Sequence, residues 1–179
     1  MRILILTLVF LTGLMNTVSG QSKTITLDSS WYGIWEGELE IWSQGKQVQQ
    51  LPMSLEIQPV GKEFTFTLIY KMNTENPDIR PYTLKPVNDS IGHFVIDEAN
   101  SILLDTYLID NCLLDLFSME SSGVYSRICN QGEYIDLEML GLGMDPIRIS
   151  GGEVIESDTM PKVSSYPLQS MTKARLIKS

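Results

Sequence analysis

Apolar and polar residues alternate with a period of two along most of this chain, as in strands that bury one face. Near the start, Trp35, Leu39 and Ile41 alternate with glutamates at positions 36, 38 and 40. The same pattern predicts nine strands, within residues 35–41, 51–57, 64–72, 82–84, 94–96, 102–108, 113–119, 124–128 and 134–140. No segment of helical length shows a 3.6-residue period, so we expect an all-β protein.

The breaks between these segments are short and rich in Gly, Asn, Asp and Ser, the residues that tight turns require. Short consecutive connections favour neighbouring antiparallel strands in an up-and-down meander. Nine amphipathic strands cannot leave one apolar face bare, so they must close on themselves. We therefore expect a barrel of about 8–10 strands; a β-sandwich is the alternative fold.

The chain divides into three segments by composition. Residues 1–20 carry an export pattern, residues 21–140 hold the predicted barrel, and residues 141–179 form an irregular C-terminal extension rich in Gly and Pro. Within this extension Met171 to Lys178 could form a closing strand, with Ala174 and Leu176 facing inward.

The N-terminal residues have the order of a secretory signal peptide. Arg2 precedes an apolar core from Ile3 to Met15, and Val18 and Gly20 place small residues before a cleavage point after Gly20. The apolar core is shorter than the roughly 20 residues that cross a bilayer as a helix. We expect cleavage, a secreted or periplasmic location, and no integral membrane segment in the mature chain.

Charge narrows the range of partners. The chain has 13 Lys and Arg against 22 Asp and Glu, a formal net charge of −9. Nucleic acids and anionic membranes attract clustered basic residues, so we expect neither as a partner. A single histidine and two cysteines do not supply a zinc site, and no phosphate-binding glycine motif occurs. We therefore expect no metal and no cofactor, and the sequence names no protein partner.

The two cysteines, Cys112 and Cys129, flank two predicted strands joined by a tight turn at Glu120 to Gly123. In a hairpin centred between Glu120 and Ser121, the cysteines face each other. Facing positions on antiparallel strands are close enough for a disulfide. An even cysteine count in an exported chain points the same way. The sequence predicts a Cys112–Cys129 bond, with two buried free thiols as the alternative.

At the first strand the chain reads Gly33-Ile34-Trp35. This resembles the Gly-x-Trp motif that opens the first strand of lipocalins and related calycins. The resemblance implies an up-and-down barrel closed at one end by the Trp, with a late-strand Arg packed over it. Arg127, Arg148 and Arg175 are the candidates for that role. The family's Thr-Asp-Tyr element is absent, since residues 105–107 read Asp-Thr-Tyr.

Few residues offer catalytic chemistry. His93 is the single histidine of the chain, and its position opposite Phe94 and Ile96 indicates a solvated strand residue. The glutamates at 36, 38 and 40 are spaced roughly 7 Å apart along one strand face, a separation known from glycosidase pairs. That face opposes the apolar one and should point to water. We therefore expect a protein that is not an enzyme, with no catalytic residues.

The favoured function is a secreted or periplasmic lipocalin-like barrel that binds a small hydrophobic molecule. An aromatic-lined barrel interior is a common ligand site. The expected lining residues are Trp35, Phe64, Phe66, Tyr70, Tyr82 and Phe94. Two other readings stay open: a non-catalytic cell-envelope module for structure or protein interaction, and a carboxylate-dependent hydrolase.

Overall fold

The computed structural model describes residues 24–71 and 75–179. The expected signal peptide, residues 1–20, lies outside the described residues. In the described part of the chain, no helix is long and apolar enough to cross a membrane.

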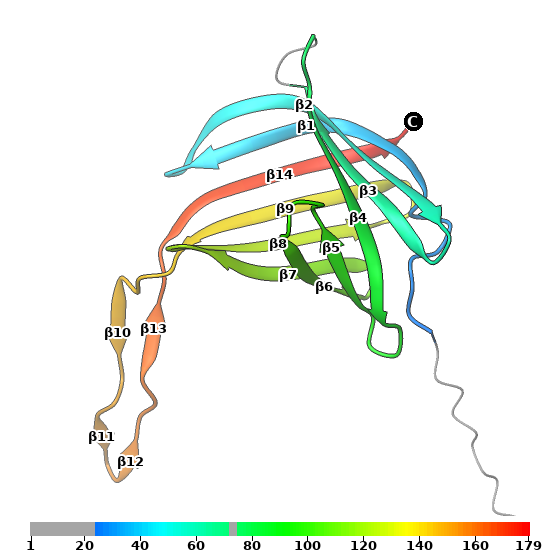
Figure 1. The fold of residues 1–179 in the computed structure, drawn as a ribbon. Coiled ribbons are helices and arrows are strands. Elements are labelled where there is room, and N and C mark those ends of the chain that lie inside the picture. The colour runs from blue at the N-terminus through cyan, green and yellow to red at the C-terminus, as the bar shows by residue number, and fades with distance from the viewer. Residues whose placement is uncertain (1–23, 72–74) are drawn as a thin grey trace, which may run out of the picture.

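Ten antiparallel strands form one closed barrel (Figure 1). Nine follow one another as a meander, and the last strand of the chain closes the barrel by pairing with both the first and the ninth. The prediction of an all-β closed meander is confirmed, and the β-sandwich alternative is wrong. The strands are β1 (Gly33–Ser43), β2 (Lys46–Val60), β3 (Glu63–Tyr70), β4 (Asp78–Asn88), β5 (His93–Asp97), β6 (Leu103–Ile109), β7 (Cys112–Met119), β8 (Ser122–Asn130), β9 (Tyr134–Gly143) and β14 (Leu168–Lys178).

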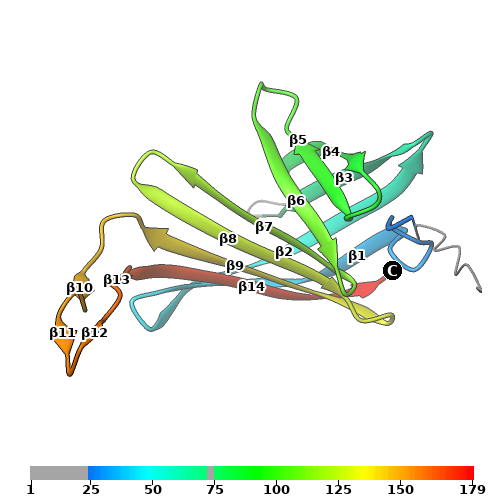
Figure 2. The same cartoon turned by 90° about the horizontal axis from the view of Figure 1, so that it is seen from below.

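Between β9 and β14 the chain leaves the barrel as a narrow arm, which projects in both views (Figures 1 and 2). The arm consists of two short antiparallel pairs. β10 (Arg148–Ser150) pairs with β13 (Val163–Ser165), and β11 (Val154–Ile155) pairs with β12 (Asp158–Thr159). Its apolar side chains are exposed, so the arm adds nothing to the barrel core.

Strand alternation sorts side chains between the barrel interior and the outside. On β1, Trp35 and Leu39 are buried, whereas the intervening glutamates face outward. The buried cluster draws inward-facing residues from every barrel strand. The period-two pattern of the sequence is therefore the pattern of one continuous barrel wall.

Residues 24–32 cover one end of the barrel, which we call the capped end. Leu27 and Trp31 are fully buried there beside Trp35. The Trp35 Nε1 donates a hydrogen bond of 2.9 Å to the backbone oxygen of Trp31. The Ile25 amide bonds the Asp89 oxygen after β4. These contacts tie the segment across the barrel end, so access to the interior has to come from elsewhere.

The cation over Trp35 is Lys178, whose Nζ lies 5.3 Å from the ring centroid. The expectation of Arg127, Arg148 or Arg175 in that role was wrong. Arg127 lies on the outer face of β8, Arg148 lies on the arm, and Arg175 pairs with Asp136 on the outside. Strand register decides the outcome, because β14 places Lys178 opposite Trp35.

Gly33 makes room for this lysine. A Cβ at Gly33 would lie 2.9 Å from the Lys178 Cε, and the backbone φ of +135° also favours glycine. The glycine of the Gly-x-Trp sequence therefore serves the contact between the last strand and the tryptophan.

Cys112 and Cys129 form the predicted disulfide. They occupy facing positions on β7 and β8, as the hairpin register required. The bond lies at the capped end, where β7 begins and β8 ends.

Prediction for the Lys178 contact. Gly33→Ala should push Lys178 off the Trp35 ring and so lose a cation–π contact of about 0.5–1 kcal/mol, in addition to backbone strain. The Lys178→Ala variant has already lost this contact. Gly33→Ala should therefore lower the free energy of unfolding by less in that variant than in wild type, and the difference should equal the cation–π contribution. Urea unfolding of the four proteins measures this coupling. Gly45→Ala, a turn glycine with no atom within 4 Å of its added Cβ, is the control and should not couple. Equal costs of Gly33→Ala in both backgrounds would contradict the assignment.

Candidate functional site

The barrel interior contains two adjoining cavities near the end opposite the cap. One has a volume of about 140 Å³ and the other about 210 Å³, and both are lined by Tyr70, Arg80 and Met139. The smaller cavity lies deeper, between strands β3 to β9, and the larger opens among β1, β2, β4 and β14. Together they reach the lower end of the roughly 300–1,000 Å³ typical of small-molecule sites.

The six aromatic residues expected to line a ligand site divide into two groups. Phe66, Tyr70 and Tyr82 line the smaller cavity. The other three, Trp35, Phe64 and Phe94, lie among the buried residues that do not line either cavity. Phe64 packs between Tyr32 and Phe94, with ring centroids 6.0 and 6.5 Å away.

Asp115 of β7 points into the smaller cavity and is the most unusual residue of the interior. Its side chain lies between Thr106 of β6 and Ser126 of β8, which occupy the facing positions. Only 7% of Asp115 is exposed, and its Oδ1 has no hydrogen-bond partner among the described residues. The Thr106 hydroxyl donates to the Leu114 oxygen instead.

Burial raises the pKa of Asp115 from 3.8 to about 6, and a hydrogen bond with Ser126 counters part of the rise. Taking a carboxylate out of water disfavours its charged form, which is the cause of the shift. At neutral pH the cavity therefore holds a buried anion with incomplete compensation.

Asp115 was not among the candidate residues that the sequence indicated. Both faces of residues 113–119 carry apolar side chains, so alternation on this strand did not show which face was inside. The cysteine pairing could have located Asp115. If Cys112 faces Cys129 across the hairpin, the register places Asp115 opposite Ser126 and on the same face of the sheet. Asp115 and Ser126 then form a cross-strand polar pair inside the barrel.

A second polar group lies at the rim of the cavities. Arg80 bonds the Asp78 Oδ2 through Nε at 3.2 Å and through Nη2 at 2.9 Å, and its guanidinium lies 5.0 Å from the Tyr70 ring centroid. The Tyr82 hydroxyl lies between Arg80 and Glu98; burial, and after it the Glu98 charge, raise the pKa of Tyr82. Arg80 is thus already paired, and the rim carries two acids for one base.

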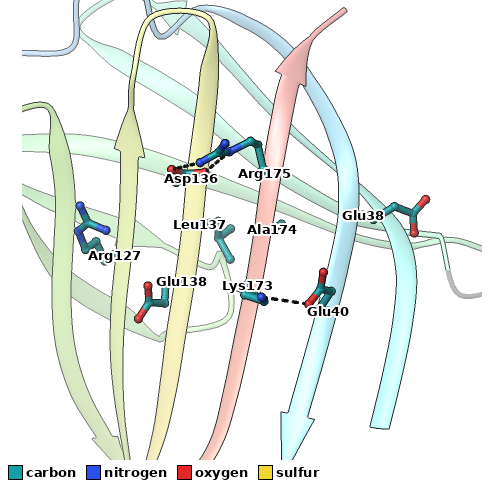
Figure 3. A pocket seen from close by; sticks show the side chains of 9 residues that line it. All are labelled: Glu38, Glu40, Arg127, Asp136, Leu137, Glu138, Lys173, Ala174 and Arg175. Carbon is teal, nitrogen blue, oxygen red and sulfur yellow. Dashed lines mark hydrogen bonds and ion pairs between the residues drawn. The ribbon is translucent and has the colours of Figure 1, made fainter. Parts of the chain in front are cut away.

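The outer wall has a hollow of about 320 Å³ across β1, β14, β9 and β8 (Figure 3). Acids and bases alternate across it. Lys173 pairs with Glu40 at 3.2 Å, and Arg175 pairs with Asp136 at 2.8 Å. The Trp42 indole and Lys173 both bond Glu40 and lower its pKa. A carboxylate held ionised in this way is a poor proton donor, so the hollow is a surface ion-pair ladder.

The other carboxylate and histidine candidates are also on the outside. Glu36 accepts hydrogen bonds from Lys71 at 3.0 Å and from the Ser179 hydroxyl at 2.9 Å. The His93 Nε2 lies 2.7 Å from the Asp105 Oδ1, and its ring stacks on Tyr107. None of these groups reaches the interior cavity, so the structure does not bring them together with Asp115.

No family model and no curated protein matches the sequence. The structure is similar to that of the S-type phycobiliprotein lyase CPES from Guillardia theta, with a TM-score of 0.53 and 6% sequence identity. The similarity covers 84% of this chain and 89% of that one. It shows that the two proteins share a closed antiparallel barrel fold.

The expectation that the protein is not an enzyme has to be corrected. A barrel of this fold belongs to a protein named as a lyase, so the fold does not support excluding enzymes. The expectation rested on scarce histidine and on outward-facing glutamates. It overlooked Asp115, because a buried carboxyl whose pKa is about 6 can exchange a proton near neutral pH.

Prediction for the buried acid. The folded-state pKa of Asp115 is above its ordinary value, so the folded protein loses stability as pH rises from about 4 through 6. Asp115→Asn removes the titrating group, so the gain in unfolding free energy over wild type should be about 2.5 kcal/mol larger at pH 7.5 than at pH 4. Urea unfolding of wild type and variant at both pH values measures this change in unfolding free energy. The other carboxylates titrate equally in both proteins, so their contribution drops out of the comparison. Asp110→Asn, in an exposed turn, should show no such pH dependence. A pH-independent effect of Asp115→Asn would contradict the assignment.

Proposed function

We propose that the protein binds a small, largely apolar molecule inside the barrel, in the cavities near the uncapped end. The observation that carries this proposal is the composition of the cavity wall. Aromatic and aliphatic side chains such as Phe66, Leu68 and Met139 surround a few converging polar groups. This is the usual composition of small-molecule sites, in which apolar area supplies affinity and polar groups fix orientation.

The cap supports the same proposal. Leu27 and Trp31 fill one end of the barrel, and the two cavities described above lie towards the opposite end. A ligand entering there would meet Tyr70 and Arg80 first and Asp115 deeper in. Tyr70 and Arg80 would thus form the entrance of the site, and Asp115 would lie at its inner end, which we call the floor.

We propose further that the protein works outside the cytosol. The export pattern of residues 1–20 motivates this location. The Cys112–Cys129 disulfide supports it, because such bonds persist in oxidising compartments. Comparing the N-terminal residue of the exported protein with Gln21 tests the cleavage site.

Prediction for the cavity. Calorimetric titration of wild type with medium-chain alcohols and fatty acids, a retinoid and a tetrapyrrole should find at least one saturable ligand. Leu104→Trp fills the smaller cavity and should weaken the binding of that ligand by at least about tenfold, or about 1.4 kcal/mol. Leu103→Trp is the matched control, because Leu103 is 61% exposed on the opposite strand face. It should bind as wild type does.

If Leu104→Trp fails to fold, Phe117→Trp fills the same cavity from β7, and Leu116→Trp is its exposed control. The absence of any saturable ligand, or full affinity in the filled variants, would overturn the proposal.

A further inference from the structure

The floor of the interior cavity carries a charge that the protein itself does not balance. Asp115 is 7% exposed, and among the described residues no ion pair includes it and no donor reaches its Oδ1. An uncompensated buried carboxylate costs stability, and replacing it by an apolar residue is often neutral or favourable. A residue with this cost inside a cavity calls for a partner that the folded chain lacks.

We propose that the interior site selects a ligand in which a basic nitrogen is joined to an apolar body, and that the Asp115 carboxylate binds that nitrogen. The inference rests on the proposed function and adds the chemical class of the ligand. The protonated nitrogen would donate to Oδ1, while the apolar body would contact Phe66, Leu68 and Met139.

The charges around the cavities favour a cation over an anion. The charged residues lining them are Asp78, Arg80, Glu98 and Asp115, three acids and one base. Arg80 pairs with Asp78 at 2.9 Å, so the charge of the one base is offset by an adjacent acid. A ligand carboxylate would meet the field of Asp115 without a compensating base, whereas an ammonium group would complete an ion pair away from water.

The same geometry makes capture depend on pH. Besides Asp115, the titratable groups around the cavity are Tyr70 on β3, Arg80 and Tyr82 on β4, and Glu98 after β5. The neighbours on β6, β8 and β9 that line it do not titrate: Leu104, Ser126, Ile128, Leu137 and Met139. An alkyl ammonium stays protonated below pH 9, so a rise in its affinity between pH 5 and 7.5 would report ionisation of Asp115.

The test uses three probes with one eight-carbon body: octylamine, octan-1-ol and octanoate. Calorimetric titration of the full mature chain at pH 7.5 should rank the amine first and octanoate last. Asp115→Asn should weaken octylamine by about tenfold to hundredfold, the range for a hydrogen bond to a charged group. It should weaken octan-1-ol by a smaller factor than octylamine, because a neutral hydroxyl loses only a neutral donor's hydrogen bond. Asp110→Asn makes the same charge change in an exposed turn and should leave all three affinities unchanged.

The outcomes separate this inference from the proposed function. If octan-1-ol binds and octylamine binds no more tightly, the choice of a basic nitrogen is overturned while the barrel site stands. If Asp115→Asn and Asp110→Asn weaken octylamine equally, the net charge of the protein and not Asp115 attracts it, and the inference also fails. If none of the three probes binds wild type, the choice of a basic nitrogen on an apolar body is overturned, while the retinoid and tetrapyrrole titrations decide the interior site separately.

Discussion

The structure depends on the closure of the barrel by its last strand. β14 pairs with β9 on one side and with β1 on the other, over almost its whole length. A nine-stranded open sheet would expose two edges and one apolar face. Closure turns that face into an interior and gives every inward residue its surroundings. It also places Lys178, at the end of β14, over the Trp35 ring at the capped end.

The interior formed in this way is not uniform. The cap fills one end with Leu27 and Trp31, and aromatic side chains pack around them. Towards the other end the filling is incomplete, and Asp115 lies at the boundary between packed core and cavity. Because β6, β7 and β8 are held in register, Asp115 cannot turn outward to water without breaking the alternation of its strand. The fold therefore maintains a buried carboxylate at a stability cost, which is a common feature of functional sites.

Much of the architecture could be predicted because it follows from alternation. The segments around Trp35–Ile41 and Phe64–Tyr70 show one apolar and one polar face, which fixed both their type and their orientation. The hairpin between Cys112 and Cys129 was predicted by geometry, since its turn sets the register of the whole pair.

The missed features depend on partners that are distant in the sequence. The cation over Trp35 is decided by the register of β14, which follows an arm of exposed residues such as Ile147 and Ile149. Asp115 stands in a strand whose two faces are both apolar, so burial could be assigned only once β7 was placed between β6 and β8. The expectation that the protein is not an enzyme weighed residue types without knowing which carboxyl was inside, and the fold's likeness to a protein named as a lyase removed its support.

The central claim is that the unfilled end of the barrel interior is the binding site. Methyl NMR with labelled methionine during titration with octan-1-ol tests it most directly. Met139 lines both cavities, whereas Met119 and Met144 are exposed near the same end. We expect a saturable shift of the Met139 methyl signal, with the other two unmoved. Shifts confined to Met119 and Met144 would place the ligand on the outside and contradict it.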